Sequence, residues 1–344
     1  MTRGFGIVGT GVIAAIHAEA IALLSETGRP DARLVAVTDV ATGAAAAFAA
    51  AHGCRAEPDV DTLLARRDVE VVCVCVPSGM HAQIGVQAAK AGKHLVVEKP
   101  IDVSLDAADR LIDAARAAGV ALTVISQHRF DAGLVELKRL LDDSALGRVV
   151  LGEASTKWYR TQGYYDSAAW RGTYAMDGGS LMNQGVHYVD LLRWCLGPAA
   201  EVTAVCTTQA HQIEVEDTAL AIVRFASGAV GTILSSTAAF PGFPQRLEIT
   251  GTEGTVTIED GRIVRRALSV DPGPVAPEGP VRSAAADPGA VDVASHAAQL
   301  ADLLAAADTG REPAVSGQAG RDALEIVLAV YESSRTGRPA VLGR

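Results

Sequence analysis

The chain has 344 residues, of which 49% are hydrophobic and 20% are charged, and its formal net charge is -10. This length exceeds that of one ordinary domain, so we expect two domains, and the composition permits a large core. The negative charge argues against non-specific binding to nucleic acid, which needs a basic surface, but it allows an anionic small molecule to be held by a local group of arginines.

The N-terminal apolar stretch predicts neither a signal peptide nor a membrane span, because glycines interrupt it and His17 and Glu19 follow. The five cysteines include no C-x-x-C pair, and Cys73 and Cys75 alternate with valines in an apolar run. We therefore expect buried, reduced thiols rather than a metal or redox site. This cysteine usage favours a cytoplasmic protein.

The first third of the chain alternates short apolar runs with helical patterns. We expect strands at residues 5–9, 33–39, 71–76, 94–97 and 120–125. Helices are expected between them, including residues 12–24, 80–91 and 105–118. Such alternation predicts a parallel sheet with right-handed crossovers, in a dinucleotide-binding domain of residues 1–127.

The pattern changes in the second predicted domain, residues 128–344. Helices are expected at residues 131–141, 179–196, 293–307 and 317–335. Strands are expected at residues 148–157, 201–208, 218–225, 229–236 and 245–250, with one more short strand after Gly254. Hairpin signals predict antiparallel pairing, and residues 271–290 are expected to form a surface loop.

A glycine motif joins the first strand to the first helix, which is the context that dinucleotide binding requires. It consists of Gly9, Thr10, Gly11, Val12 and Ile13. Gly9 permits a tight turn, and Gly11 lets the main chain approach a pyrophosphate that rests on the helix N-terminus.

Asp39 ends the second strand, where a carboxylate can accept hydrogen bonds from ribose hydroxyls. The same carboxylate would repel a 2′-phosphate, and no basic residue follows at positions 40–42. NAD is therefore favoured over NADP. The alternative is a helix cap or turn residue without a ligand.

The third strand ends in Val76, Pro77 and Ser78, at the carboxyl edge of the sheet, where ligands bind in open α/β folds. We expect these residues to contact the nicotinamide ribose. His81 lies one turn into the next helix, so it is a candidate cofactor contact, with a surface or capping role as the alternative.

Glu98 and Lys99 end the fourth strand at the same edge, before Pro100, and both are candidate cofactor contacts. The ammonium group of Lys99 can donate to a substrate oxygen and help to move a proton. The alternative is an exposed lysine paired with Glu98.

Asn183, His187 and Asp190 are spaced at i, i+4 and i+7, so one continuous helix would place them on one stripe. His187 has an unperturbed pKa near neutrality, which suits a general acid–base. Asn183 would orient the substrate or the lysine, and Asp190 could hold the imidazole tautomer. The alternative is a solvated pair of His187 and Asp190.

Aromatic residues gather in the segment between residues 158 and 173, although they form only 4% of the chain. Tyr159, Arg160, Trp170 and Arg171 are the candidate substrate contacts here. Flat rings pack on sugar faces, and guanidinium groups bind hydroxyls or anions. The alternative is that buried aromatic residues attach this loop to the second domain.

These motifs together resemble the family of glucose–fructose oxidoreductase, inositol dehydrogenase and rhizopine-catabolism proteins (Gfo/Idh/MocA). The matching segments are Gly9 to Ala14 with His17, Val76 to Ser78 with His81, Glu98 to Pro100, and Gly178 to His187 with Asp190. Their combination is specific, whereas no single motif is.

The resemblance implies an N-terminal Rossmann domain and a C-terminal α/β domain whose large, mostly antiparallel sheet often mediates homodimers or homotetramers. It implies catalytic roles for Lys99 and His187, and places Gln127 and Arg129 near the cofactor or substrate. Many family members carry aspartate where this chain has Asn183. Since asparagine cannot serve as a carboxylate base, proton transfer would depend on His187 and Lys99.

The sequence thus predicts a dehydrogenase that uses NAD to oxidise a hydroxyl group of a sugar, sugar derivative or cyclitol, or to reduce the keto form. We expect no bound metal, no nucleic acid and no membrane among its partners. Two alternatives stay open: an NAD-dependent glycoside hydrolase of the same fold, and a non-catalytic dinucleotide-binding regulator.

Overall fold

The structure, a computed structural model, describes residues 3–270, 285 and 293–343. It divides into two compact units, Met1–Gln127 with Val291–Arg321, and His128–Ala290 with Asp322–Arg344. The loop expected at residues 271–290 lies outside the described residues, except for Ala285.

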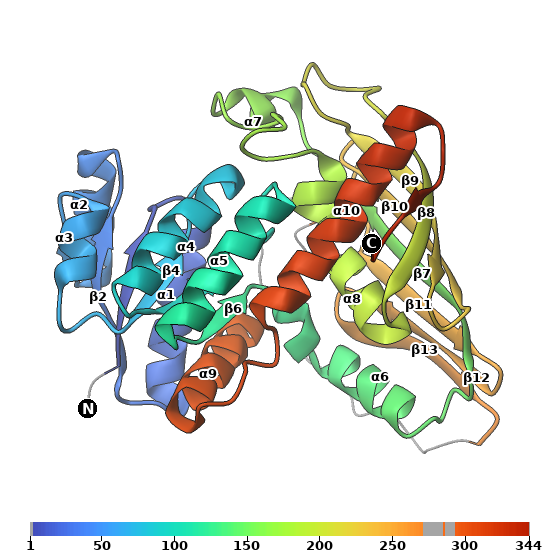
Figure 1. Cartoon of the computed structure of the whole chain (residues 1–344), viewed down its shortest axis with the longest axis horizontal. Helices are drawn as coiled ribbons and strands as arrows, with labels where there is room; N and C mark the ends of the chain where they lie inside the picture. The colour runs from blue at the N-terminus through green and yellow to red at the C-terminus, as the bar shows by residue number, and fades with distance from the viewer. Residues whose placement is uncertain (1–2, 271–284, 286–292, 344) are drawn as a thin grey trace. The chain divides into compact units, whose positions relative to one another are not determined.

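The first unit contains a six-stranded parallel sheet in the order β3-β2-β1-β4-β5-β6 (Figure 1). Its strands are β1 (Arg3–Val8), β2 (Ala32–Thr38), β3 (Arg55–Ala56), β4 (Val71–Val74), β5 (His94–Val97) and β6 (Leu122–Val124). This order reverses direction between β1 and β4, as in Rossmann domains. The predicted parallel sheet is confirmed.

Six helices of the described residues belong to the first unit. They are α1 (Val12–Thr27), α2 (Thr42–His52), α3 (Val60–Ala65), α4 (His81–Lys90), α5 (Leu105–Ala118) and α9 (Val293–Thr309). Helix α9 packs against α1 although it lies far away in the sequence, and Leu300 and Leu304 join Phe5 and Ile21 in one buried core. The side chain of Gln299 also reaches β6, where it donates to the carbonyl of Val124.

The second unit contains an eight-stranded sheet in the order β13-β12-β11-β7-β10-β9-β8-β14 (Figure 1). The strands are β7 (Val149–Lys157), β8 (Ala199–Thr207), β9 (Thr218–Phe225), β10 (Val230–Ser236), β11 (Arg246–Gly251), β12 (Gly254–Glu259), β13 (Arg262–Leu268) and β14 (Ala340–Val341). Most pairs are antiparallel, as predicted, but β7 and β10 pair in parallel. Strands β13 and β14 were not predicted.

Helices α6 (Ala132–Asp142), α8 (Val186–Leu196) and α10 (Gly317–Thr336) accompany this sheet, α10 starting in the first unit (Figure 1). Gly152 on β7 lets α8 approach, because a Cβ there would crowd the side chains of Leu192 and Leu196. Along β9, buried and exposed residues alternate, which is typical of a sheet covered on one face. The other face exposes apolar side chains, including Val205, Leu220 and Ile222.

Two details of the second unit correct the sequence analysis. The expected helix over residues 179–196 begins as a π-helix, η3 (Leu181–Gly185), before α8 starts. Asn183 therefore lies on a wider helical turn than His187 and Asp190, and the α-helical spacing does not relate the three residues. The expected loop after β7 also contains a short helix, α7 (Gln162–Asp166).

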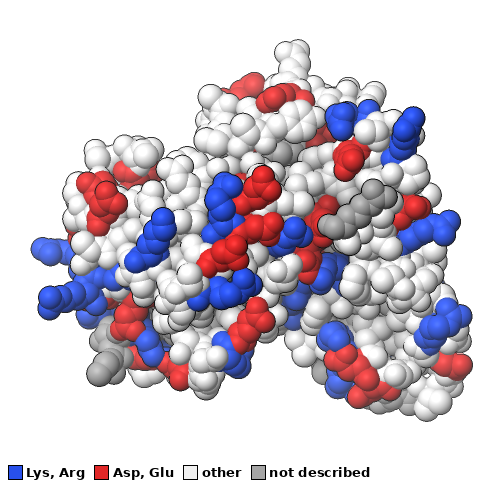
Figure 2. Space-filling model, viewed as in Figure 1, with Lys and Arg blue, Asp and Glu red and all other residues white. Residues whose placement is uncertain are grey.

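All five cysteines are thiols, and Cys73 and Cys75 are buried as predicted. Basic and acidic side chains intermingle over the face shown in Figure 2. Within the described part of the chain, no helix is both long enough and apolar enough to cross a bilayer. A cytoplasmic location stays a prediction.

Candidate active site

The glycine turn after β1 has two glycines with different physical roles. Gly9 has a φ of +92°, and a Cβ there would overlap the carbonyl of Cys75, so the fold itself needs glycine. Gly11 precedes α1, and a Cβ there would meet nothing within 4 Å. Open space beside Gly11 is what a pyrophosphate needs in order to approach the main chain.

Asp39 stabilises this turn from the end of β2. Its Oδ2 accepts from the main-chain N–H of Thr10 at 2.7 Å and from the Thr10 hydroxyl at 3.0 Å, and its Oδ1 accepts from the N–H of Ala41 at 2.8 Å. The carboxylate is half-buried. Asp39 therefore acts as a turn residue, which was the alternative in the sequence analysis. The same bonds place its carboxylate beside the glycine motif.

The residues around this turn fit a dinucleotide. Helix α1 has no side-chain cap and no acidic residue in its first turn, so its positive end is available for phosphate. At the end of the sheet, the amide oxygen of Gln127 is buried and has no hydrogen-bond partner among the described residues. A buried acceptor in this state is expected to pair with a ligand donor.

His81 is a buried link between two segments at the carboxyl edge. Its Nδ1 lies 2.7 Å from the carbonyl oxygen of Pro100, and its Nε2 lies 2.9 Å from that of Val76. Burial lowers the pKa of His81, more than the neighbouring acceptors raise it. The neutral ring donates to one of these two carbonyls, so His81 ties the segment after β4 to the segment after β5. Ser78, also buried, lies in the short 3-10 turn after Pro77.

Glu98 ends β5 inside the unit rather than at its surface. Its Oε1 lies 2.8 Å from Nε2 of His17, and its Oε2 accepts from the main-chain N–H of Lys99 at 3.2 Å. Burial opposes ionisation, but the bond and charge of His17 lower the pKa of Glu98 to about 2. Lys99 follows in a half-buried position. Glu98, a candidate cofactor contact in the sequence analysis, thus makes a buried contact with His17, and the role of Lys99 stays a prediction.

His296 on α9 completes this buried group. One imidazole nitrogen each from His17 and His296 and one carboxylate oxygen of Glu98 lie within 4.8 Å of one another. The rings of the two histidines meet edge to face, with centroids 5.7 Å apart. The hydrogen bond and the charge interaction with His17 stabilise the buried carboxylate of Glu98.

Asn183 lies in the π-helix of the second unit and donates from its Nδ2 to Asp177. The other oxygen of Asp177 accepts from the N–H of Gly172 at 2.9 Å. Asn183 is thereby oriented by a carboxylate that also shapes the loop before it.

His187 is buried at the start of α8, with 8% of its surface exposed. Its ring meets that of His128 edge to face, with centroids 5.2 Å apart. His128 is itself held by Asp131, with Nδ1 and Oδ2 2.7 Å apart. The sequence analysis missed His128, although its place between Gln127 and Arg129 was a usable signal.

Arg129 forms a buried ion pair with Asp190. Its Nε donates to Oδ2 of Asp190 at 2.8 Å and its Nη2 donates to Oδ1, while its guanidinium lies 5.3 Å from the ring of Trp194. Arg129 was predicted to contact the substrate, but its guanidinium group is bound to Asp190 inside the second unit. Both carboxylate oxygens of Asp190 accept from this arginine.

Glu216 carries a buried carboxyl group that the sequence analysis missed. It is 3% exposed, and its Oε1 accepts from the N–H of Leu181 at 2.8 Å and from the Tyr331 hydroxyl at 3.1 Å. Burial raises its pKa to about 7. A Cβ on Gly179 would overlap this carboxyl, so the glycine at this position lets Glu216 approach.

The aromatic segment contains one buried and one partly exposed arginine. Arg160 donates to the carbonyls of Tyr159 and Ala285 and is 4% exposed. Arg171 is half-buried between the rings of Tyr164 and Trp170, at 4.4 and 4.5 Å. The alternative of buried aromatic residues applies to Trp158 and Tyr165, which are both buried, and Arg171 stays the better candidate for a ligand contact.

Comparison with known proteins agrees with this architecture. A family model described as an oxidoreductase family with an NAD-binding Rossmann fold matches residues 3–126, and the GFO/IDH/MocA C-terminal domain matches residues 134–257. The chain belongs to the GFO/IDH/MocA family. It is an oxidoreductase with an NAD-binding Rossmann domain, as the motifs predicted.

The chain is also similar to three proteins of known name. Inositol 2-dehydrogenase from Rhizobium meliloti is 30% identical, with 97% of each chain covered. Myo-inositol 2-dehydrogenase from Thermotoga maritima is 27% identical, with 98% of each covered. The WlbA dehydrogenase from Bordetella pertussis, solved with NADH and UDP-GlcNAcA, is 32% identical over the full length of both chains, with a TM-score of 0.88.

Proposed function

We propose that the protein transfers hydride between NAD and a hydroxyl or keto carbon of a sugar, sugar derivative or cyclitol. In the oxidative direction, the alcohol and NAD⁺ give the ketone, NADH and a proton. In oxidation, His187 accepts the hydroxyl proton and Lys99 donates a hydrogen bond to the same oxygen; in reduction His187 gives a proton to that oxygen and Lys99 again donates to it. Bound NAD supplies the hydride acceptor or donor.

The observation that carries this proposal is the placement of His187 in an NAD-binding oxidoreductase. Its ring is buried at a helix start, beside a second imidazole and four residues after an oriented asparagine. In the first unit, Lys99 follows β5 at the edge where α/β sheets bind ligands. Both groups can exchange or stabilise a proton on oxygen, as hydride transfer from an alcohol requires.

The substrate class follows from the relatives and from Arg171. Two relatives are named inositol dehydrogenases, and a third was solved with a UDP-sugar acid. We propose that Arg171, held between two rings, contacts hydroxyl or acidic groups of a related substrate, with Tyr159 and Trp170 contributing apolar faces.

A panel of inositols, sugars, UDP-sugar acids and their keto forms, each with NAD and with NADP, tests this proposal. Absorbance of the reduced nicotinamide should change with at least one member and with NAD in preference to NADP. Hydrolysis of a glycoside without net NADH would instead support the hydrolase alternative. NAD binding without turnover on any member would support the regulator.

We also propose a homodimer or homotetramer formed through the exposed face of the eight-stranded sheet. Val205, Leu220 and Ile222 are 65%, 49% and 56% exposed there, and an apolar face of this kind is typical of an interface. Light scattering should give a multiple of the 35.5 kDa chain mass, and Ile222→Lys should reduce it.

A further inference from the structure

The connection from β8 to β9, residues 208–217, lies along the aromatic segment of residues 158–177. We call the first segment the template loop and the second the aromatic loop. The N–H of Gln212 donates to the side-chain oxygen of Gln162 at 2.8 Å, and the N–H of Glu214 donates to the carbonyl of Gly172 at 3.1 Å. The main chain of the template loop therefore contacts the aromatic loop at two positions, residues 212 and 214.

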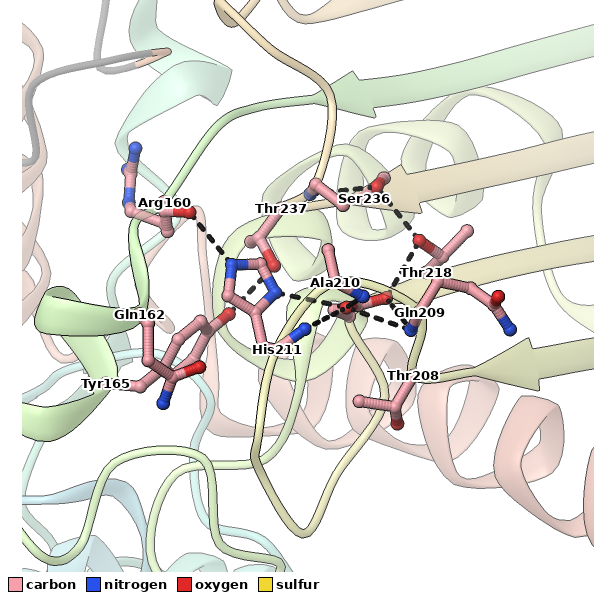
Figure 3. Close-up of polar contacts among 12 residues, drawn as sticks. Arg160, Gln162, Tyr165, Thr208, Gln209, Ala210, His211, Thr218, Ser236 and Thr237 are labelled. Carbon is pink, nitrogen blue, oxygen red and sulfur yellow. Dashed lines mark hydrogen bonds and ion pairs between the residues drawn. The ribbon is translucent and has the colours of Figure 1, made fainter.

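Asp217 folds the template loop around its own carboxylate. It accepts from the N–H groups of Gln209, Ala210 and His211 at 2.7–3.2 Å and from the Thr218 hydroxyl at 3.1 Å (Figure 3 shows the donors). Burial alone would raise the pKa of Asp217, but these donors hold it below its ordinary value. The carboxylate is thus ionised and acts only as an acceptor.

His211 connects this carboxylate to the aromatic loop. Its Nδ1 lies 3.0 Å from Oδ2 of Asp217, and its Nε2 lies 2.9 Å from the carbonyl oxygen of Arg160 (Figure 3). The side chain is only 4% exposed. The His211 ring also packs edge to face on Tyr165, with centroids 4.9 Å apart. The Tyr165 hydroxyl is hydrogen-bonded to the Thr237 hydroxyl.

Both ring nitrogens of His211 therefore face atoms that can only accept. His211 therefore links the carboxylate of Asp217 to the main chain of the aromatic loop through its two ring nitrogens.

We propose that His211 is a positioning residue that bridges Asp217 and the Arg160 carbonyl and so holds the aromatic loop in the shape that binds substrate. The proposal rests on the proposed function, because it takes the aromatic loop as the substrate contact. Without the bridge, the carbonyl of Arg160 loses its contact with Nε2 of His211, and the neighbouring rings that flank Arg171 lose a fixed support.

The bridge can be tested without any substrate, because hydrogen exchange reports directly on the amides of the aromatic loop.

Kinetics and hydrogen exchange then test positioning. His211→Phe keeps a ring but removes both donors, and His211→Gln keeps a donor on one side. We expect the substrate KM to rise about 10-fold or more in His211→Phe and less in His211→Gln, with kcat within about twofold. Amides of residues 160–166 should exchange faster in both variants, while the Kd for NAD stays unchanged.

Gln212→Ala is the matched control, because Gln212 contributes its main chain to the contact and its side chain is exposed. It should keep the wild-type KM and exchange rates. A wild-type KM and wild-type exchange in His211→Phe would contradict the proposal. If the wild type itself turns over no substrate, the proposed function fails, whereas the exchange rates still decide the positioning role.

Discussion

Nε2 of His17 lies 2.8 Å from Oε1 of Glu98, and both side chains are buried at the strand end that leads into Lys99. A carboxylate whose pKa is lowered contributes stability that is present above the unfolded pKa near 4.5 and is lost as the pH falls through the folded value of about 2. Glu98→Gln keeps the shape but removes this titration.

Between pH 4.5 and pH 2, the free energy of unfolding should therefore fall by roughly 3 kcal/mol more in the wild type than in Glu98→Gln. Urea unfolding followed by circular dichroism at several pH values measures both slopes. Equal slopes would mean that the Glu98 charge is not stabilised by His17.

The two glycines of the turn after β1 should separate folding from cofactor binding. Gly9→Ala should destabilise the protein by about 2 kcal/mol or more, because the new Cβ overlaps the Cys75 carbonyl at a positive φ. Gly11→Ala should fold like the wild type, since its Cβ enters open space, but bind NAD at least about 10-fold more weakly. Thermal unfolding and fluorescence titration with NAD measure the two effects, and an unchanged Kd in Gly11→Ala would place the pyrophosphate elsewhere.

Asp39 should set the choice of cofactor. Asp39→Ser keeps a small polar residue near Thr10 but removes the charge that accepts from ribose and repels a 2′-phosphate. The ratio of Kd for NADP to Kd for NAD should fall about 10-fold or more, the scale of one hydrogen bond to a charged group. Titration with both cofactors measures the ratio, and a constant ratio would leave Asp39 with its turn-capping role alone.

Glu216 should give the opposite pH dependence to Glu98. Its pKa is raised to about 7, so the folded protein holds a proton that the unfolded chain releases near 4.5. The stability from this group is fully present below 4.5 and is lost as the pH rises toward 7. Over this pH range, the free energy of unfolding should decline by roughly 3 kcal/mol less in Glu216→Gln than in the wild type. Urea titrations at pH 5 and pH 8 test it; a decline as steep as that of the wild type would show that Glu216 is ionised in the fold.

Much of the architecture follows from short-range pattern. Fully apolar β4 and the alternating residues of β9 were predictable because burial on two faces or one face leaves a direct mark on the sequence. The glycine motif and Asp39 were predictable because dinucleotide binding imposes local geometry on the main chain.

Other features depend on contacts between distant segments. Arg129 meets Asp190 across 61 positions, and Glu216 meets Leu181 and Tyr331 from separate elements, so neither spacing nor composition reveals them. The π-helix at residues 181–185 was missed for a related reason: its apolar pattern resembles an α-helix, and tertiary contacts decide the wider turn. The template loop carries no recognisable motif, and its role appears only from its partners.

The most direct test of the proposed chemistry is steady-state turnover of Lys99→Ala and His187→Ala, with NAD affinity measured on the same preparations. We predict that each variant binds NAD within about threefold of the wild type while kcat falls on the order of 10²-fold or more. Wild-type turnover in both variants would contradict the assignment of the lysine and the histidine to catalysis.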